Sequence, residues 1–193
     1  GWFKNPELVL DFYNQRRKQL QEVLPNDGHL ILAELEADFE VHIITQNVDN
    51  LHEKAGSSNV LHLHGELLKV RSNKDKNYIL DWETDLVLGD LDKIGNQLRP
   101  HIVWFGEMVP MIEPAADLCL NADFFAVVGT SLQVYRAAGL IGFVGDDVPK
   151  FIIDPHTPEV SSQYKNLTFI TETATVGVPQ FAELLKKFLI PNS

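Results

Sequence analysis

The chain has 193 residues, the size of one domain or of one domain with a small insertion. Its 45% hydrophobic and 22% charged residues are ordinary for a globular protein, and its net charge of −11 argues against a general nucleic-acid binder. The single cysteine, Cys119, excludes an internal disulfide framework and a cysteine-only zinc site. No apolar run reaches the ~20 residues of a membrane helix, and no signal segment opens the sequence, so we expect a cytoplasmic protein without a membrane span.

The predicted elements alternate between helices and strands. Asn5-Pro6-Glu7 is typical of a helix start, and Pro25 should end that helix near residue 24. A second helix is expected from residues 26–27 to 37. Further strands are expected at 41–45, 59–63, around Val103, at 123–129 and at 150–154, and further helices at 50–55, 113–121 and 178–189. Several strands are nearly all apolar, which predicts a doubly wound, Rossmann-like α/β fold with a parallel sheet.

One stretch, residues 72–97, interrupts this alternation. It is polar and charged, and only residues 80–88 have the pattern of a hairpin. We therefore expect a single domain over residues 1–193 that carries a small inserted subdomain at residues 69–100.

Polar side chains follow the first predicted strand, where ligands bind in an open parallel sheet. The segment Thr45-Gln46-Asn47-Val48-Asp49-Asn50-Leu51-His52 offers two amides and a carboxylate, which suit the binding of hydroxyls and a carboxamide. The same residue types are also common in a turn that caps a helix, so both interpretations stay open.

Two other strand ends carry candidate chemistry. Alternation along the second strand predicts His62 and His64 on one face, and an imidazole beside Gly65 suits a general base. A hydrogen-bonded structural histidine is the alternative, and taken alone the pattern favours it. No third ligand with recognisable spacing supports a metal site there. Gly129-Thr130-Ser131 ends the fourth strand and suits ribose or phosphate oxygens.

The first helix contains an arginine in an apolar stripe. The stripe runs through Val9, Tyr13, Arg16, Leu20 and Val23. A buried guanidinium needs a partner, and Tyr13 and Arg16, three residues apart, share a face that suits an acidic ligand. Arg16 reaching water or pairing with an internal acid is the alternative.

Together these residues resemble the sirtuin family, the NAD-dependent protein-lysine deacylases. The resemblance extends in order from Asn5 to Leu189 through Thr45–His52, Leu63-His64-Gly65, Val103-Trp104-Phe105-Gly106-Glu107 and Gly129-Thr130-Ser131. The segment Phe12–Arg17 is similar to the class III branch, in which a tyrosine and an arginine accept succinyl, malonyl or glutaryl groups.

The resemblance implies a role for each matched residue. His64 would be the general base on a hydroxyl of the nicotinamide ribose, Gln46 and Asn47 would orient that ribose, and Asp49 would meet the carboxamide. The expected residues on the adenosine side of NAD are Gly129, Thr130, Ser131, Asp154, Ala174 and Thr175. The expected substrate-binding residues are Tyr13 and Arg16 for the acyl group, Val103 and Phe105 for the acyl-lysine tunnel, and Gly106 and Glu107 for an acylated protein that pairs as an added strand.

The implied reaction consumes NAD as a co-substrate. The acyl oxygen attacks the ribose as nicotinamide leaves, and His64 assists the next ribose hydroxyl, which yields lysine and an O-acyl-ADP-ribose. Two alternatives stay open: an ADP-ribosyltransferase, whose mark would be ADP-ribosylated protein, and a non-catalytic module that binds NAD or ADP-ribose. The oligomeric state is not predicted.

The sequence departs from the family in three places. The interval between Arg71 and Arg99 lacks the four zinc-binding cysteines, so we expect no zinc. Asp154 stands where an asparagine is common at the adenosine ribose. The N-terminal strand and glycine-rich phosphate turn of the family have no match in this sequence, so we expect weak NAD binding and little turnover from this chain alone.

Overall fold

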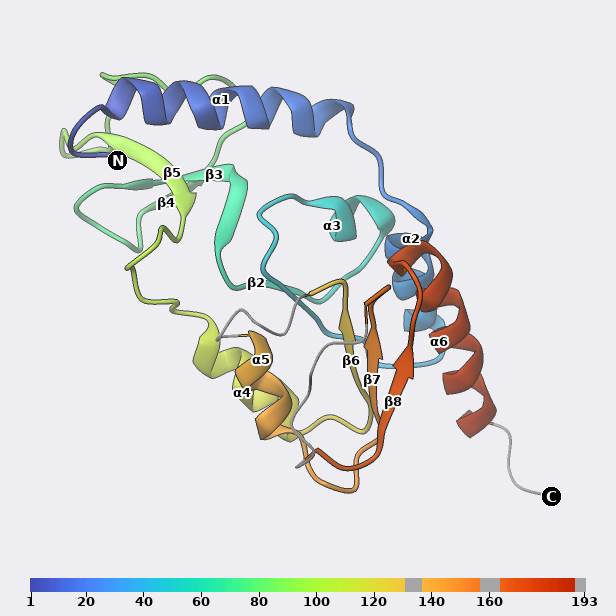
Figure 1. Ribbon diagram of the computed structural model, residues 1–193. Coiled ribbons are helices and arrows are strands. Elements are labelled where there is room, and N and C mark those ends of the chain that lie inside the picture. The colour runs from blue at the N-terminus through green and yellow to red at the C-terminus, as the bar shows by residue number, and fades with distance from the viewer. Residues whose placement is uncertain (131–136, 157–163, 190–193) are drawn as a thin grey trace. The chain divides into compact units, whose positions relative to one another are not determined.

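The computed structural model describes residues 1–130, 137–156 and 164–189 (Figure 1). Contacts divide the chain into two compact units. Unit 1 comprises residues 1–24, 45–50 and 62–109, and unit 2 comprises residues 25–44, 51–61 and 110–193. Residues 69–100, expected as a small subdomain, lie within unit 1 together with the first helix.

Unit 1 combines a long helix with an antiparallel sheet. Helix α1 (Pro6–Glu22) starts as predicted, because the Asn5 side chain accepts a hydrogen bond from the N–H of Leu8 at 3.1 Å. The sheet has the order β4-β3-β5, with β3 (Gly65–Ser72) between β4 (Ile79–Asp81) and β5 (Leu98–Ile102). The prediction of a parallel strand around Val103 is wrong, since β5 ends before Val103 and runs antiparallel to β3. The expected hairpin at residues 80–88 is also wrong, because β4 pairs with β3.

The core of unit 1 lies between α1 and this sheet. It is formed by apolar residues, which are Leu10, Val70, Leu86 and Leu98, with Trp2, Tyr78 and Trp82 packed against them. Two polar residues of α1 are also buried, Asn14 and Arg17. The Asn14 amide donates to the Leu86 carbonyl at 3.0 Å and accepts from the Leu86 N–H at 2.9 Å, which ties the helix to that segment.

The loop before β5 is held by one carboxylate. Asp92 accepts hydrogen bonds from the backbone N–H groups of Ile94 at 3.0 Å and of Asn96 at 2.8 Å, and from the Asn96 side chain at 2.9 Å. Burial raises the pKa of Asp92, but these bonds and one from Ser72 outweigh it and lower the pKa from 3.8 to about 2. The loop is therefore closed by an ionised side chain at neutral pH.

Unit 2 is built on a parallel sheet with the order β6-β7-β8, formed by β6 (Phe125–Val128), β7 (Lys150–Ile153) and β8 (Leu167–Ile170). This is the parallel α/β arrangement predicted from the apolar strands, although the sequence did not indicate β8. The helices of unit 2 are α2 (Asp27–Glu34) with the 3₁₀ turn η1 (Leu35–Ala37), α3 (Leu51–Ala55), α4 (Ile112–Leu120), α5 (Ala137–Leu140) with η2 (Ile141–Phe143), and α6 (Ala174–Leu189).

The core of unit 2 lies where α2 and α6 meet the sheet (Figure 1). Its buried members come from η1, β7, β8 and α6 and include Leu35, Phe151, Ile153, Ile170, Val178, Phe181, Ala182 and Leu185. The Lys150 ammonium is also buried and donates to three backbone carbonyls, those of Gly145 at 2.6 Å, Val148 at 2.9 Å and Lys165 at 3.4 Å.

Two short strands form a separate pair, β1 (Ile43–Thr45) and β2 (Val60–His62). The N–H of Ile43 donates to the carbonyl of Asn59 at 2.8 Å, and the N–H of Leu63 donates to the carbonyl of Thr45 at 2.9 Å. Residue numbers rise together along both strands, as in a parallel pair. Among the helices in the described part of the chain, none has the length and apolarity that a membrane span requires.

Candidate active site

The loop after β1 is fixed through its backbone carbonyls. The carbonyl of Gln46 lies 3.1 Å from His64 Nδ1, and the carbonyl of Asn47 lies 3.1 Å from His62 Nδ1. The carbonyl of Val48 accepts a hydrogen bond from the N–H of Leu67 at 2.7 Å. The Asn47 side chain is exposed and the Gln46 side chain is half-buried. The loop is thus rigidly placed while its amide side chains stay available to a ligand.

The contact of His64 with a carbonyl decides which of its nitrogens carries a proton. A carbonyl oxygen only accepts hydrogen bonds, so Nδ1 of His64 is the donor, and in the neutral imidazole the lone pair is on Nε2. The strand ends at His62, so the predicted alternation that places both histidines on one strand face is wrong for His64, which lies in the following turn. The orientation comes from the loop instead and leaves Nε2 of His64 suited to accept a proton.

Gly65 permits the close approach that holds His64 in place. Its φ is +83°, and a Cβ atom there would overlap the backbone carbonyl oxygen of His101. The N–H of Val103, the residue just after β5, donates to the carbonyl of His64 at 2.9 Å. The backbone of the candidate base is therefore held against the end of β5.

The buried arginine of α1 is Arg17, and of the two interpretations of Arg16 the structure supports the alternative in which it reaches water. Arg16 is exposed, and its guanidinium lies over the Phe12 ring at 4.6 Å from the ring centroid. Tyr13 is half-buried, and its hydroxyl accepts a hydrogen bond from Trp104 Nε1 at 2.9 Å. An exposed cation and a hydroxyl three residues apart on one helix suit an anionic ligand.

The segment after β5 forms a tight turn. The N–H of Glu107 donates to the carbonyl of Trp104 at 2.9 Å, Gly106 has a φ of +87°, and the Phe105 side chain is fully exposed. Gly106 and Glu107 thus lie in a turn in this structure, and the pairing of a substrate peptide with them stays a prediction. Val103, just before the turn, is half-buried.

The Glu107 carboxylate is engaged within unit 1. It pairs with Arg71 at 3.1 Å and with Arg99 at 2.8 Å, and it accepts from the backbone N–H of Trp104 at 2.9 Å. Burial raises the pKa of Glu107, but these donors and cations outweigh it and lower the pKa below its usual value. Only the backbone of Glu107 is therefore available to form hydrogen bonds with a substrate.

The residues expected on the adenosine side lie in unit 2. Gly129 directly follows β6, has a φ of +58° and donates its N–H to the carbonyl of Ile153 at 2.9 Å, and Asp154 follows β7, the neighbouring strand. Thr130 is half-buried, and Ser131 lies outside the described residues. A Rossmann-like sheet binds a nucleotide at the carboxyl ends of adjacent parallel strands. The turn at Gly129, which has no side chain, and the carboxylate of Asp154 are therefore suited to bind a ribose.

The end of unit 2 differs from the prediction in one respect. Helix α6 begins at Ala174 rather than at Val178, so Ala174 and Thr175 lie in its first turn. The hydroxyls of Thr173 and Thr175 are 3.1 Å apart. Backbone N–H groups in a first helical turn have no partner within the helix, which suits them to a polar ligand.

A zinc site like that of the family does not fit the residues present. Residues 72–97 contain neither cysteine nor histidine, the ligands from which structural tetrahedral zinc sites are built. The Asp92 hydrogen bonds described above hold part of this segment instead. That no zinc binds stays a prediction.

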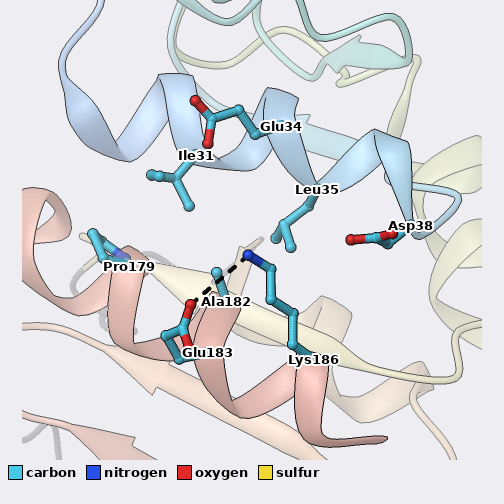
Figure 2. Close-up of a pocket in the computed structure, with 8 residues that line it drawn as sticks. All are labelled: Ile31, Glu34, Leu35, Asp38, Pro179, Ala182, Glu183 and Lys186. Carbon is cyan, nitrogen blue, oxygen red and sulfur yellow. Dashed lines mark ion pairs between the residues drawn. The ribbon is translucent and has the colours of Figure 1, made fainter. Parts of the chain in front are cut away.

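A groove of about 270 Å³ lies elsewhere in unit 2, between α2 with η1 and α6 (Figure 2). Its lining includes Ile31, Leu35 and Ala182, and Figure 2 shows Glu183 directed toward Lys186, with the two charged groups 3.8 Å apart. Among the residues that the structure describes, none of those expected to bind NAD or substrate lines this groove.

Comparison with known proteins identifies the family. The model of the Sir2 family matches residues 1–136. The chain belongs to the Sir2 family. A Helicobacter pylori protein named NAD-dependent protein deacylase is 55% identical over 179 residues, covering 90% of this chain and 76% of its own.

Solved structures of the Sir2 family are also similar to this chain. A Sir2 homologue in complex with NAD has a TM-score of 0.84 and 34% identity, covering 98% of this chain and 75% of its own. Sir2 bound to an acetylated peptide has a TM-score of 0.74 and 26% identity, covering 97% of this chain and 80% of its own. The Rossmann-like α/β fold predicted from the sequence is confirmed.

Sequence reasoning did not single out Trp104 as a site residue. It lies between two residues expected to line the acyl-lysine tunnel, Val103 and Phe105, yet its indole bonds to Tyr13 on α1. The bond joins residues 91 positions apart, and no spacing rule indicates it.

Proposed function

We propose that this protein is an NAD-dependent protein-lysine deacylase that prefers acidic acyl groups such as succinyl and malonyl. The observation that carries the proposal is the histidine of the Sir2 motif, His64, whose Nδ1 donates to a carbonyl, so that Nε2 is the nitrogen left to accept a proton. Membership of the Sir2 family and relatives named NAD-dependent protein deacylase support the reaction class.

In this proposal NAD is a co-substrate that supplies the ADP-ribose to which the acyl group is transferred. Nε2 of His64 accepts the proton of a ribose hydroxyl as that hydroxyl attacks the acyl carbon. The exposed amide of Asn47, with Gln46 and Asp49 on the same anchored loop, orients the nicotinamide ribose and its carboxamide. Gly129, Thr130, Ser131, Asp154, Ala174 and Thr175 hold the adenosine side.

The protein substrate presents its acyl-lysine beside Val103 and Phe105. Pairing of the peptide with Gly106 and Glu107 requires the turn at these residues to extend, which a glycine at the second central position allows at low conformational cost. The structure of Sir2 bound to an acetylated peptide supports acyl-lysine peptides as the substrate class.

The acyl preference depends on Tyr13 and Arg16. The exposed Arg16 guanidinium and the Tyr13 hydroxyl offer a cation and a hydrogen-bond donor to a terminal carboxylate, which an acetyl group lacks. Arg16→Met should lower kcat/KM for a succinyl-lysine peptide by about 10- to 100-fold and change that for an acetyl-lysine peptide far less.

The matched control is Lys18→Met, which also removes one positive charge from an exposed position of α1, where Lys18 pairs with Asp85 at 2.8 Å. This control should leave the succinyl-to-acetyl ratio unchanged. Equal losses on both peptides in Arg16→Met would refute the acyl preference. Mass spectrometry of the products tests the reaction itself. Formation of O-succinyl-ADP-ribose would support the deacylase reaction, whereas ADP-ribosylated protein in the absence of O-succinyl-ADP-ribose would refute it.

A further inference from the structure

The hydrogen bond between Trp104 and Tyr13 restricts where the tyrosine proton can point. An indole N–H is a donor only, so at 2.9 Å the Tyr13 oxygen is the acceptor. The hydroxyl proton of Tyr13 must then be directed away from Trp104. A tyrosine without this partner would rotate its proton freely between acceptors.

The indole of Trp104 is held by neighbours on several sides. Its backbone N–H donates to Glu107 at 2.9 Å, and the Arg99 guanidinium lies 3.4 Å from the centroid of its ring. Arg99 is itself fixed, since it donates to Glu107 at 2.8 Å and to the carbonyl of Ile102 at 2.8 Å. The centroid of the Trp2 ring lies 5.7 Å from that of the Trp104 ring. Nε1 of Trp104 is thus placed before any ligand arrives.

Burial of Tyr13 keeps the proton on its hydroxyl, although the neighbouring cations act in the opposite direction. Burial raises the pKa of Tyr13, and the Trp104 hydrogen bond and the cations Arg99 and Arg16 lower it only in part. The phenol therefore stays neutral at neutral pH and retains a proton to donate. A cation against the indole face makes the indole N–H a stronger donor.

We propose that Trp104 determines acyl specificity by orienting the Tyr13 hydroxyl, so that its proton is presented to the carboxylate of an acidic acyl group. This inference rests on the proposed function. Trp104 acts through Tyr13 and is a positioning residue, with Arg99 and Glu107 holding it in place. An acetyl group has no carboxylate to accept the oriented proton, so the effect is confined to acidic acyl groups.

The test is the ratio of kcat/KM for succinyl-lysine and acetyl-lysine peptides in Trp104→Phe, which removes the indole N–H and keeps an aromatic ring. The ratio should fall about tenfold, the size of one hydrogen bond to a charged group. Trp82→Phe is the matched control, because it removes an indole N–H that donates to the Asp85 carbonyl at 3.3 Å elsewhere in unit 1. The control should keep the wild-type ratio.

A double-mutant cycle separates positioning from a general loss of structure. In a Tyr13→Phe background, Trp104→Phe should not lower the ratio further, because the hydroxyl on which it acts is gone. An equal further fall in that background would overturn the inference. A wild-type preference that survives in Trp104→Phe would overturn the inference alone, whereas no wild-type preference for succinyl would overturn the proposed function as well.

An assay without turnover reports on the same hydrogen bond. The absorbance titration of Tyr13, taken as the difference between a protein with Tyr13 and its Tyr13→Phe counterpart, isolates one of the four tyrosines. Trp104→Phe should raise the pKa of Tyr13, because a donor that stabilises the phenolate is lost. An unchanged titration in a folded Trp104→Phe protein would mean that the bond is not formed in solution.

Discussion

Replacing the buried Arg17 by methionine should destabilise unit 1. Arg17 is 1% exposed and donates to the Leu67 carbonyl at 3.2 Å, the Thr84 carbonyl at 3.1 Å and the Asn14 side chain at 2.8 Å. The substitution leaves the Leu67 carbonyl buried without this donor, which costs ~1–3 kcal/mol, and removes two further charge-assisted bonds. Relief of the buried charge offsets part of this loss, so we expect a net loss of about 2–4 kcal/mol in the free energy of unfolding.

The neighbouring arginine provides the control. Arg16 is exposed and contacts only the Phe12 ring among the groups described above, so Arg16→Met should change the free energy of unfolding by at most ~0.5 kcal/mol. Urea unfolding followed by tryptophan fluorescence suits this comparison. The chain has three tryptophans, Trp2, Trp82 and Trp104, and all lie in unit 1, so the signal reports on that unit.

Two results would refute the reasoning. Equal unfolding midpoints for Arg17→Met and the wild-type protein would mean that the hydrogen bonds of Arg17 contribute no net stability. A larger loss in Arg16→Met than in Arg17→Met would mean that the buried face of α1 has been assigned to the wrong residues.

Three further predictions concern single side chains. Gly65→Ala should cost at least ~2 kcal/mol of stability, because its Cβ meets backbone at a positive φ, whereas Gly89→Ala, also at a positive φ but in open space, should cost less in the same unfolding assay. Asp92→Asn should destabilise unit 1 at pH 7 and flatten its acid unfolding, because a pKa lowered to about 2 gives stability that is complete above ~pH 4 and lost as the pH falls toward 2. A slope as steep as that of the wild type would contradict this. Burial raises the pKa of Cys119 to about 11, so its thiol should react with a chromogenic disulfide at pH 8 only after unfolding, and rapid labelling of the native protein would show that it is accessible.

The starts of α1 and α2 could be predicted from local sequence because their determinants are local. Asn5 and Asn26 cap α1 and α2 through bonds to N–H groups three residues ahead. The buried face of α1 could not be predicted in this way. The apolar stripe in the sequence selects residues 9, 13 and 16, whereas the buried face of the helix includes Asn14 and Arg17. The partners that make burial of Arg17 tolerable lie 50 and 67 positions away in the sequence.

Strand β5 shows a similar limit. It contains Arg99 and Pro100, both buried, although a proline lacks the N–H of a sheet ladder and an arginine is seldom buried without a partner. The apolar residues just after it therefore attracted the prediction of a strand around Val103. The ion pair between Arg99 and Glu107, which compensates the buried charge, becomes visible only once the turn after β5 is folded.

The buried amine at the start of β7 has a chemical consequence. Acyl donors react with neutral, accessible lysine amines, and the Lys150 ammonium is enclosed and donates to three carbonyls at once. In a protein exposed to reactive acyl thioesters, Lys150 should be the last lysine to be modified, while exposed ones such as Lys18 and Lys187 should be modified early. A protein proposed to strip acyl groups from lysines thus keeps one lysine of its own where acylating reagents reach it only through unfolding.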